Sequence, residues 1–196
     1  MYHVTLVHKE AILSYRFYGF SQITAEMEKM NTHDNIVLIG MPGSGKSTVG
    51  IILAKMLTRP YLDSDILLQL VENRSLQEII DTQGYMALRE IEERVLLDIR
   101  CENHVIATGG SAAYSHKAMQ HLKQNGVIVF LDASLQTLNS RIHNYETRGL
   151  AKRADQSFAD LFQERFTLYS RYADITVDSN RKSQEEVCEQ IIALCS

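Results

Sequence analysis

The chain has 196 residues, of which 45% are hydrophobic and 22% charged, with two prolines and no tryptophan. This length and composition are those of an ordinary globular protein with a substantial core. A formal net charge of −4 at pH 7 argues against a general nucleic-acid binder, which usually presents a basic face. The three cysteines form no CxxC pair, so reduced thiols in a cytosol are expected rather than a metal or redox centre.

Residues 1–34 carry no recognisable targeting signal. The apolar run Val4–Val7 stops at His8, too early for the core of a secretory signal, and acidic residues nearby weigh against a transit peptide. No run in the chain approaches the ~20 apolar residues of a membrane helix. We therefore expect a cytoplasmic protein, with no membrane partner, in which residues 1–34 are an appendage outside the functional core. Met30 is an alternative natural start.

Strand-like and helix-like segments alternate over residues 35–196. This alternation predicts an α/β domain with a parallel sheet and helices on both of its faces. The strand candidates are continuous β-branched runs, which are typical of strands buried on both sides. They are residues 36–39, 61–63, 105–108, 127–132 and 175–178.

Sequence patterns that mark helix N-termini occur at three places. Capping-box pairs, in which a serine precedes Glu or Asp by three positions, occur at Ser75 and Glu78, Ser157 and Asp160, and Ser183 and Glu186. Apolar residues at helical spacing predict a helix over residues 85–103. Residues 144–156 are polar and without a clear period, so we expect a long mobile loop there.

A phosphate-binding loop is the strongest single motif. The stretch GMPGSGKS, residues 40–47, matches G-x-x-x-x-G-K-[ST] between a predicted strand and a predicted helix. Its glycines let backbone N–H groups turn toward phosphate oxygens, and the helix adds the positive end of its dipole. Lys46 is expected to reach the β- and γ-phosphates, and the Ser47 hydroxyl to bind Mg²⁺. The predicted ATP-binding residues of the loop are Gly43, Ser44, Gly45, Lys46, Ser47 and Thr48.

Two carboxylates follow the second predicted strand. Ligands of a parallel sheet sit beyond the carboxyl ends of its strands, where Asp63 and Asp65 fall. Residues two apart on an extended segment point the same way, so both can face the phosphate loop. One could bind the Mg²⁺ shell while the other accepts a proton from an attacking hydroxyl. A helix N-cap at Ser64 or Asp65 is the alternative.

Two further features favour an acceptor site. Arg89 and Glu92 share a helix face, so the carboxylate can orient a guanidinium fork suited to a substrate carboxylate. Gly109 and Gly110 end a strand, where bare N–H groups allow a ligand to approach closely. A surface ion pair and a simple tight turn are the respective alternatives.

In this order, these motifs resemble the shikimate kinase family over residues 36–196. That family carries the phosphate loop, a D-x-D after the second strand, an F-R-x-x-E helix, a G-G-G turn, a lid with an arginine, and a late R-x-x-x-Y helix. The resemblance implies a P-loop kinase fold of five parallel strands in the order 2-3-1-4-5. It also implies that ATP and Mg²⁺ are used to convert shikimate to shikimate 3-phosphate in aromatic amino-acid biosynthesis.

The resemblance assigns roles residue by residue. Asp63 would hold the magnesium shell with Ser47, while Lys46, Asp65 and Arg148 would be the catalytic groups. Arg89, supported by Glu92, and Arg165 would bind the shikimate carboxylate, with Tyr169 completing the last motif. Asp65, Gly109 and Gly110 would contact the ring hydroxyls, and Arg141 would pack on adenine. Arg148 would reach the transferring phosphate from a lid within residues 144–156 that excludes water.

The sequence departs from the family pattern at four places. The lid reads Arg148-Gly149-Leu150-Ala151 instead of R-P-L-L, and Ser111 replaces the third glycine of the turn. Leu88 replaces an aromatic residue and Gln184 a common proline. A related P-loop kinase for another polyol or sugar acid, such as gluconate, is therefore the first alternative. A nucleotide-binding regulatory module without turnover is the second. We expect a monomer with only small-molecule partners.

Overall fold

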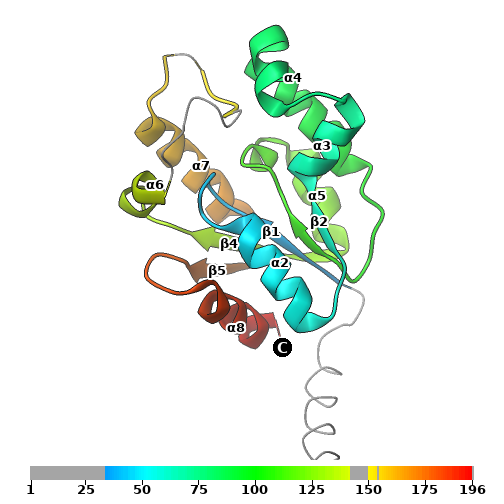
Figure 1. Ribbon diagram of the computed structural model, residues 1–196, viewed down its shortest axis with the longest axis vertical. Coiled ribbons are helices and arrows are strands. Elements are labelled where there is room, and N and C mark those ends of the chain that lie inside the picture. The colour runs from blue at the N-terminus through cyan, green and yellow to red at the C-terminus, as the bar shows by residue number, and fades with distance from the viewer. Residues whose placement is uncertain (1–33, 142–149, 154, 196) are drawn as a thin grey trace, which may run out of the picture. The chain divides into compact units, whose positions relative to one another are not determined.

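Five strands form one parallel sheet in the computed structural model, which describes residues 34–141, 150–153 and 155–195 (Figure 1). The strands are β1 (Asn35–Ile39), β2 (Tyr61–Asp63), β3 (Val105–Ala107), β4 (Gly126–Asp132) and β5 (Ile175–Asp178). Their order is β2-β3-β1-β4-β5, and every neighbouring pair is parallel. The predicted fold class and strand order are confirmed, and each predicted strand agrees with the structure to within one residue at either end.

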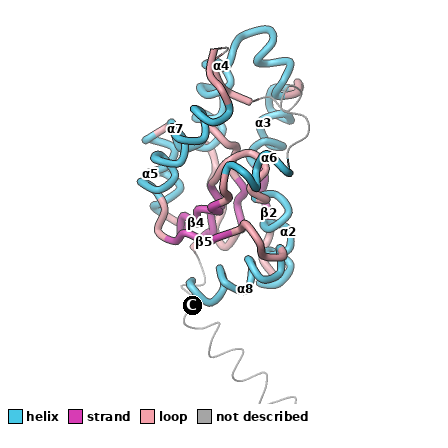
Figure 2. The backbone as a smooth tube through the Cα atoms, turned by 90° about the vertical axis from the view of Figure 1, so that its left-hand side faces the viewer, coloured by secondary structure: helices cyan, strands magenta, loops and turns pink. Residues whose placement is uncertain are grey.

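Helices cover both faces of this sheet, as Figure 2 shows from the side. The helices are α2 (Lys46–Leu57), α3 (Ser64–Glu72), α4 (Leu76–Leu97), η1 (Ala112–Tyr114), α5 (His116–Gln124), α6 (Leu135–Arg141), α7 (Phe158–Tyr172) and α8 (Gln184–Cys195). Residues of α4, α5 and α7 share one buried cluster with the sheet. On the opposite face, α2 and α8 meet where the Cys188 thiol lies 3.5 Å from the carbonyl of Val49.

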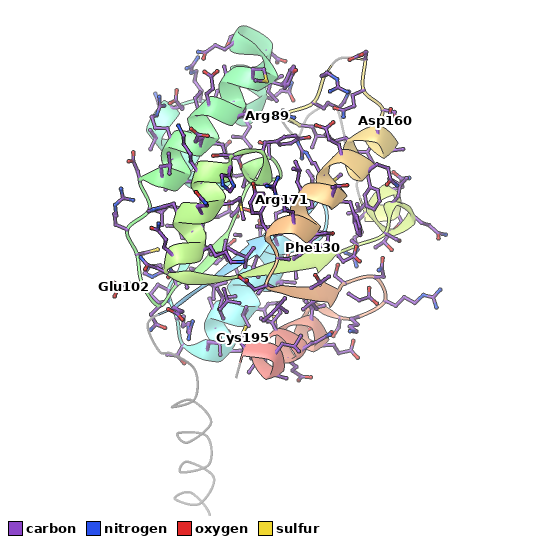
Figure 3. The ribbon with its side chains drawn as sticks, turned by 180° about the vertical axis from the view of Figure 1, so that it is seen from behind. Arg89, Glu102, Phe130, Asp160, Arg171 and Cys195 are labelled. Atoms are coloured by element: carbon purple, nitrogen blue, oxygen red, sulfur yellow. The ribbon has the colours of Figure 1, made fainter. Side chains whose placement is uncertain are left out.

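The central strand β1 shows why the strand sequences are apolar throughout. Val37 and Ile39 belong to the cluster with α4, α5 and α7, whereas Leu38 faces α2. Side chains alternate between the faces of a strand, so a strand covered on both faces needs apolar residues at every position. On β4, Phe130 packs under Tyr169 of α7 with ring centroids 5.3 Å apart; Figure 3 labels this phenylalanine.

The helix predicted over residues 85–103 is part of a longer element with different ends. α4 begins at the capping box of Ser75 and Glu78 and kinks at Gly84, whose φ of 85° is not helical. It ends at Leu97, so the prediction is wrong at its C-terminal end. The Arg100 guanidinium donates to the carbonyls of Leu97 and Ile99, and so satisfies groups that another helical turn would otherwise have paired.

The other two capping boxes are also present. Ser157 caps α7 together with Asp160, and Ser183 exchanges hydrogen bonds with Glu186 at the start of α8. Most of the predicted loop over 144–156 lies outside the described residues. Within the described part of the chain, no helix has both the length and the apolar character needed to span a membrane.

Candidate active site

The phosphate loop joins β1 to α2 at the carboxyl edge of the sheet. Gly40, Gly43 and Gly45 all have positive φ. This backbone conformation is strained for residues that carry a Cβ, whereas glycine adopts it readily. A Cβ on Gly40 would also lie 2.8 Å from the carbonyl of Leu131. The loop geometry therefore requires glycine where the motif places it.

Lys46 lies inside this loop. Its side chain is buried, and its ammonium donates to the carbonyls of Gly40 (2.8 Å) and Met41 (3.0 Å). Burial lowers the pKa of Lys46 to about 8, although the carboxylates of Asp65 and Asp63 oppose this shift. A triphosphate would supply the anionic partner that this buried cation lacks.

Ser47 and Asp63 meet at the mouth of the loop. The Ser47 hydroxyl donates to Asp63 Oδ2 over 2.8 Å, and the Tyr61 hydroxyl donates to the same oxygen over 3.0 Å. Asp63 Oδ1 accepts from the N–H groups of Asp65 and Ile66, so Asp63 is the N-cap of α3. The expected alternative of an N-cap is therefore met, but at Asp63, while its other oxygen faces Ser47. A hydroxyl and a carboxylate are hard oxygen ligands of the kind Mg²⁺ takes.

Asp65 begins the acceptor side. It is half-buried and lies against Gly109, where an added Cβ would come within 2.5 Å of Asp65 Oδ1. Burial raises the pKa of Asp65, the Lys46 ammonium opposes this, and the Asp63 carboxylate adds to it. Gly109 itself is held by its N–H, which donates to the Ser64 hydroxyl over 2.9 Å. Glycine at position 109 leaves room for the carboxyl groups of both Asp65 and Glu92.

Two arginines from different helices converge on one carbonyl. Arg89 of α4 and Arg165 of α7 donate to the carbonyl of Ala151 over 3.3 and 2.9 Å. The Arg89 guanidinium also stacks 3.4 Å from the ring centre of Tyr114, and both arginine Nε atoms are buried without a hydrogen-bond partner among the described residues. Figure 3 labels Arg89, which stands in the second half of α4. The pair forms a cationic pocket with unused donors, suited to a carboxylate.

Glu92 does not take the position expected of it. It is 4% exposed and accepts a hydrogen bond from the Ser111 hydroxyl through Oε2, while its Oε1 has no hydrogen-bond partner in the described part of the chain. The structure records no ion pair between the described side chains of Glu92 and Arg89. Burial, together with the nearby Asp65 carboxylate, raises the pKa of Glu92 to about 7. The expectation that Glu92 supports Arg89 is therefore wrong.

Gly110 connects the acceptor side to α7. Its carbonyl accepts from the Tyr169 hydroxyl over 2.6 Å, and an added Cβ would lie 2.8 Å from Arg165 Nη1 and 2.9 Å from Pro42. Arg165 and Tyr169 stand four residues apart on α7. This spacing places the Arg165 guanidinium in the cationic pocket and the Tyr169 hydroxyl against the carbonyl of Gly110. The turn at Gly110 cannot accept a larger residue without moving the arginine.

Arg141 lies at the opposite end of the site. Its guanidinium donates to the carbonyls of Ser179 (2.7 Å) and Asn180 (3.4 Å) in the segment between β5 and α8. These bonds hold its planar group beside the start of α8. Arg141 and Gln184 both line the cavity described next.

One cavity of about 480 Å³ connects these groups. Its lining includes nine predicted site residues: Gly43, Gly45, Lys46, Ser47, Thr48, Asp65, Gly110, Arg141 and Arg165. Ser44, Asp63, Arg89 and Gly109 adjoin it without lining it, and Arg148 lies outside the described residues. Sequence reasoning did not anticipate the contributions of Tyr114 and of the Ala151 carbonyl. A cavity of this size accommodates small molecules only.

A phosphate-binding loop that opens directly onto a small-molecule cavity lined by Arg141 and Arg165 places the chain in the class of P-loop kinases that phosphorylate small molecules. The family model described as shikimate kinase matches residues 42–196. The chain belongs to the shikimate kinase family.

Individual relatives agree with this assignment. A shikimate kinase from Rippkaea orientalis is 39% identical over 162 residues, which cover 81% of this chain and 86% of that protein. One from Aquifex aeolicus is 36% identical over 160 residues, covering 81% and 95%. Among solved structures, the shikimate kinase from Acinetobacter baumannii in complex with shikimate superposes with a TM-score of 0.76 at 30% identity, covering 83% of this chain and 93% of that one.

Proposed function

We propose that this chain transfers the γ-phosphoryl group of ATP to a hydroxyl of shikimate, giving shikimate 3-phosphate and ADP. The observation that carries the proposal is the convergence of Arg89 and Arg165 on the carbonyl of Ala151, a residue that lines the same cavity as Asp65 and Lys46. This arrangement can hold an acid by its carboxylate while a hydroxyl of the same molecule faces the phosphate loop.

The phosphate loop and Lys46 would bind the β- and γ-phosphates and stabilise the negative charge that develops during transfer. Arg141 would pack against the adenine ring. Ser47 and Asp63 would hold Mg²⁺, which supplies further charge neutralisation at the phosphates when bound. The hydrogen bond between their side chains brings two suitable oxygen ligands together beside the loop.

On the acceptor side, Arg89 and Arg165 would clamp the carboxylate, which has to displace the carbonyl of Ala151 from both guanidinium groups. Asp65 would bind the attacking hydroxyl and accept its proton, and burial that raises the pKa of Asp65 suits a proton acceptor. Gly109 and Gly110 would bring backbone groups close to the ring. Arg148 is proposed from the sequence alone to act on the transferring phosphate.

An ADP-release assay with shikimate, quinate, gluconate and no acceptor tests this function directly. We expect turnover that depends on shikimate and Mg²⁺, with little ADP released in the absence of an acceptor. Turnover on gluconate but not on shikimate would move the chain to another acceptor. Binding of ATP without turnover on any acceptor would favour a regulatory module. We further propose a cytoplasmic monomer.

A further inference from the structure

The side chains of Arg89 and Glu92 are spaced to form an ion pair but do not form one. Both stand on α4, three positions apart, where opposite charges ordinarily meet. Each nevertheless has a buried polar atom that finds no hydrogen-bond partner among residues 34–141, 150–153 and 155–195: Nε of Arg89 and Oε1 of Glu92. Two opposite charges that share one helix face without pairing indicate that other contacts keep them apart.

Those contacts are visible on both sides. Tyr114 stacks under the Arg89 guanidinium at 3.4 Å and directs it toward the carbonyl of Ala151. Ser111, which is 6% exposed, donates its hydroxyl to Glu92 Oε2. In this position the Glu92 carboxylate lies against Gly109 and near Asp65. A Cβ added to Gly109 would overlap Glu92 Oε1 and would also approach Asp65 Oδ1. Among the described residues, the Ser111 hydroxyl is thus the only group that donates a hydrogen bond to the Glu92 carboxylate.

We propose that Ser111 is a positioning residue that determines acceptor affinity: it holds Glu92 away from Arg89 and so keeps the guanidinium available for the acceptor carboxylate. Without the Ser111 hydroxyl, Glu92 is free to pair with Arg89 and compete with the substrate for it. Such competition leaves only a fraction of the enzyme able to bind acceptor, and the apparent affinity falls by that fraction. This inference rests on the proposed function, since it concerns how the same site binds shikimate.

The decisive variant is Ser111→Ala, compared with Ser111→Gly, which removes the same hydroxyl. We expect the shikimate KM to rise about fivefold to tenfold in both, with kcat nearly unchanged. The methyl ester of shikimate, which has no carboxylate for the arginines to bind, should bind the wild type and the variants equally, as measured by calorimetry. A general distortion of the pocket would weaken both ligands.

Glu92→Gln provides a second, independent test of the proposed role of Ser111. A neutral amide cannot compete for Arg89 as a carboxylate does, so adding Glu92→Gln to Ser111→Ala should return the shikimate KM to within about twofold of that of Glu92→Gln alone. The matched control is Ser115, whose hydroxyl donates to the neighbouring Glu93 over 2.6 Å away from the cavity lining. Ser115→Ala should leave the shikimate KM unchanged.

The outcomes separate the two proposals. Wild-type turnover on shikimate with an unchanged KM in Ser111→Ala and Ser111→Gly would overturn the role of Ser111 and leave the function standing. A raised KM that Glu92→Gln does not rescue would also overturn it. Absence of shikimate turnover in the wild type would overturn the proposed function itself. Circular dichroism of each variant identifies any that fails to fold, and the comparison of Glu92→Gln with the double variant then still tests the coupling.

Discussion

The Ser47 hydroxyl donates a 2.8 Å hydrogen bond to Asp63 Oδ2. This bond links the phosphate loop, which follows β1, to the end of β2, although β3 lies between these two strands in the sheet. The other oxygen of Asp63 caps α3. One carboxylate therefore combines a structural role with a position beside the expected Mg²⁺ site. A substitution that keeps the cap but removes the charge can separate these two roles.

Asp63→Asn is such a substitution, because asparagine caps helices as well as aspartate does. We expect the Mg²⁺ concentration for half-maximal ADP release to rise about 10-fold to 100-fold, with little loss of thermal stability. Asp81→Asn, at a surface position on α4, is the control. An unchanged Mg²⁺ dependence in Asp63→Asn would restrict Asp63 to its capping role.

Arg89→Lys tests the cationic pocket. One ammonium cannot reproduce the planar fork or its stacking on Tyr114, so the KM for shikimate should rise about 10-fold to 100-fold while the KM for ATP stays constant. Arg94→Lys is the matched control, because Arg94 stands on the same helix and pairs with Glu72 at the surface. Steady-state kinetics with each substrate varied provides the measurement. Equal effects of both substitutions would mean that Arg89 is only an ion-pair residue.

Gly109→Ala should damage the acceptor side alone. The new Cβ would lie 2.5 Å from Asp65 Oδ1 and would overlap Glu92, so both carboxyl groups have to move. A displacement of this size at reacting groups costs up to about 100-fold in rate, and we expect kcat/KM for shikimate to fall by about 10-fold to 100-fold. Nucleotide affinity measured by calorimetry is the internal control and should not change. A parallel loss of ATP binding would indicate collapse of the whole site.

The buried carboxyl of Glu92 predicts a pH-dependent stability. Its pKa rises from 4.5 to about 7 on folding, mainly through burial, so the folded protein binds this proton more tightly than the unfolded chain. Stability from this group is therefore complete below pH 4.5, is lost between pH 4.5 and 7, and stays lost above. The cost above pH 7 is about 3 kcal/mol.

Glu92→Gln removes this titration. The variant should be more stable than the wild type at pH 8, by up to about 3 kcal/mol, and the advantage should shrink as the pH falls to 5. Urea unfolding at the two pH values measures the difference, with Glu93→Gln as the control on the same helix. A constant difference at both pH values would contradict the raised pKa of Glu92.

Local patterns were sufficient for the strands, the phosphate loop and the helix starts. Each depends on residues adjacent in sequence: β-branched runs buried on both faces, glycines with positive φ, and serines that bond three positions ahead. Arg89 and Arg165 were predicted to share a ligand only through the family resemblance. Their convergence depends on how α4 and α7 pack, and spacing alone cannot show it.

The parts that sequence reasoning missed depend on contacts between distant segments or on the backbone. Helical spacing suggested that Glu92 would pair with Arg89, but a turn after β3 brings Ser111 to it instead. The group that joins the two arginines is the carbonyl of Ala151, which every residue possesses and no sequence pattern marks. Buried pairings of this kind are decided by tertiary packing.

We propose that residues 1–29 are dispensable for catalysis. The family match begins at residue 42, the first described strand at Asn35, and the cavity lining runs from Pro42 to Gln184. A chain that starts at Met30 should therefore keep kcat and the shikimate KM within about twofold of the full chain, with a similar Tm. The matched control starts at Ile39 and lacks most of β1. Because β1 is the buried central strand, that control should not fold. An unfolded, inactive chain from Met30 would instead show that the first 29 residues belong to the core.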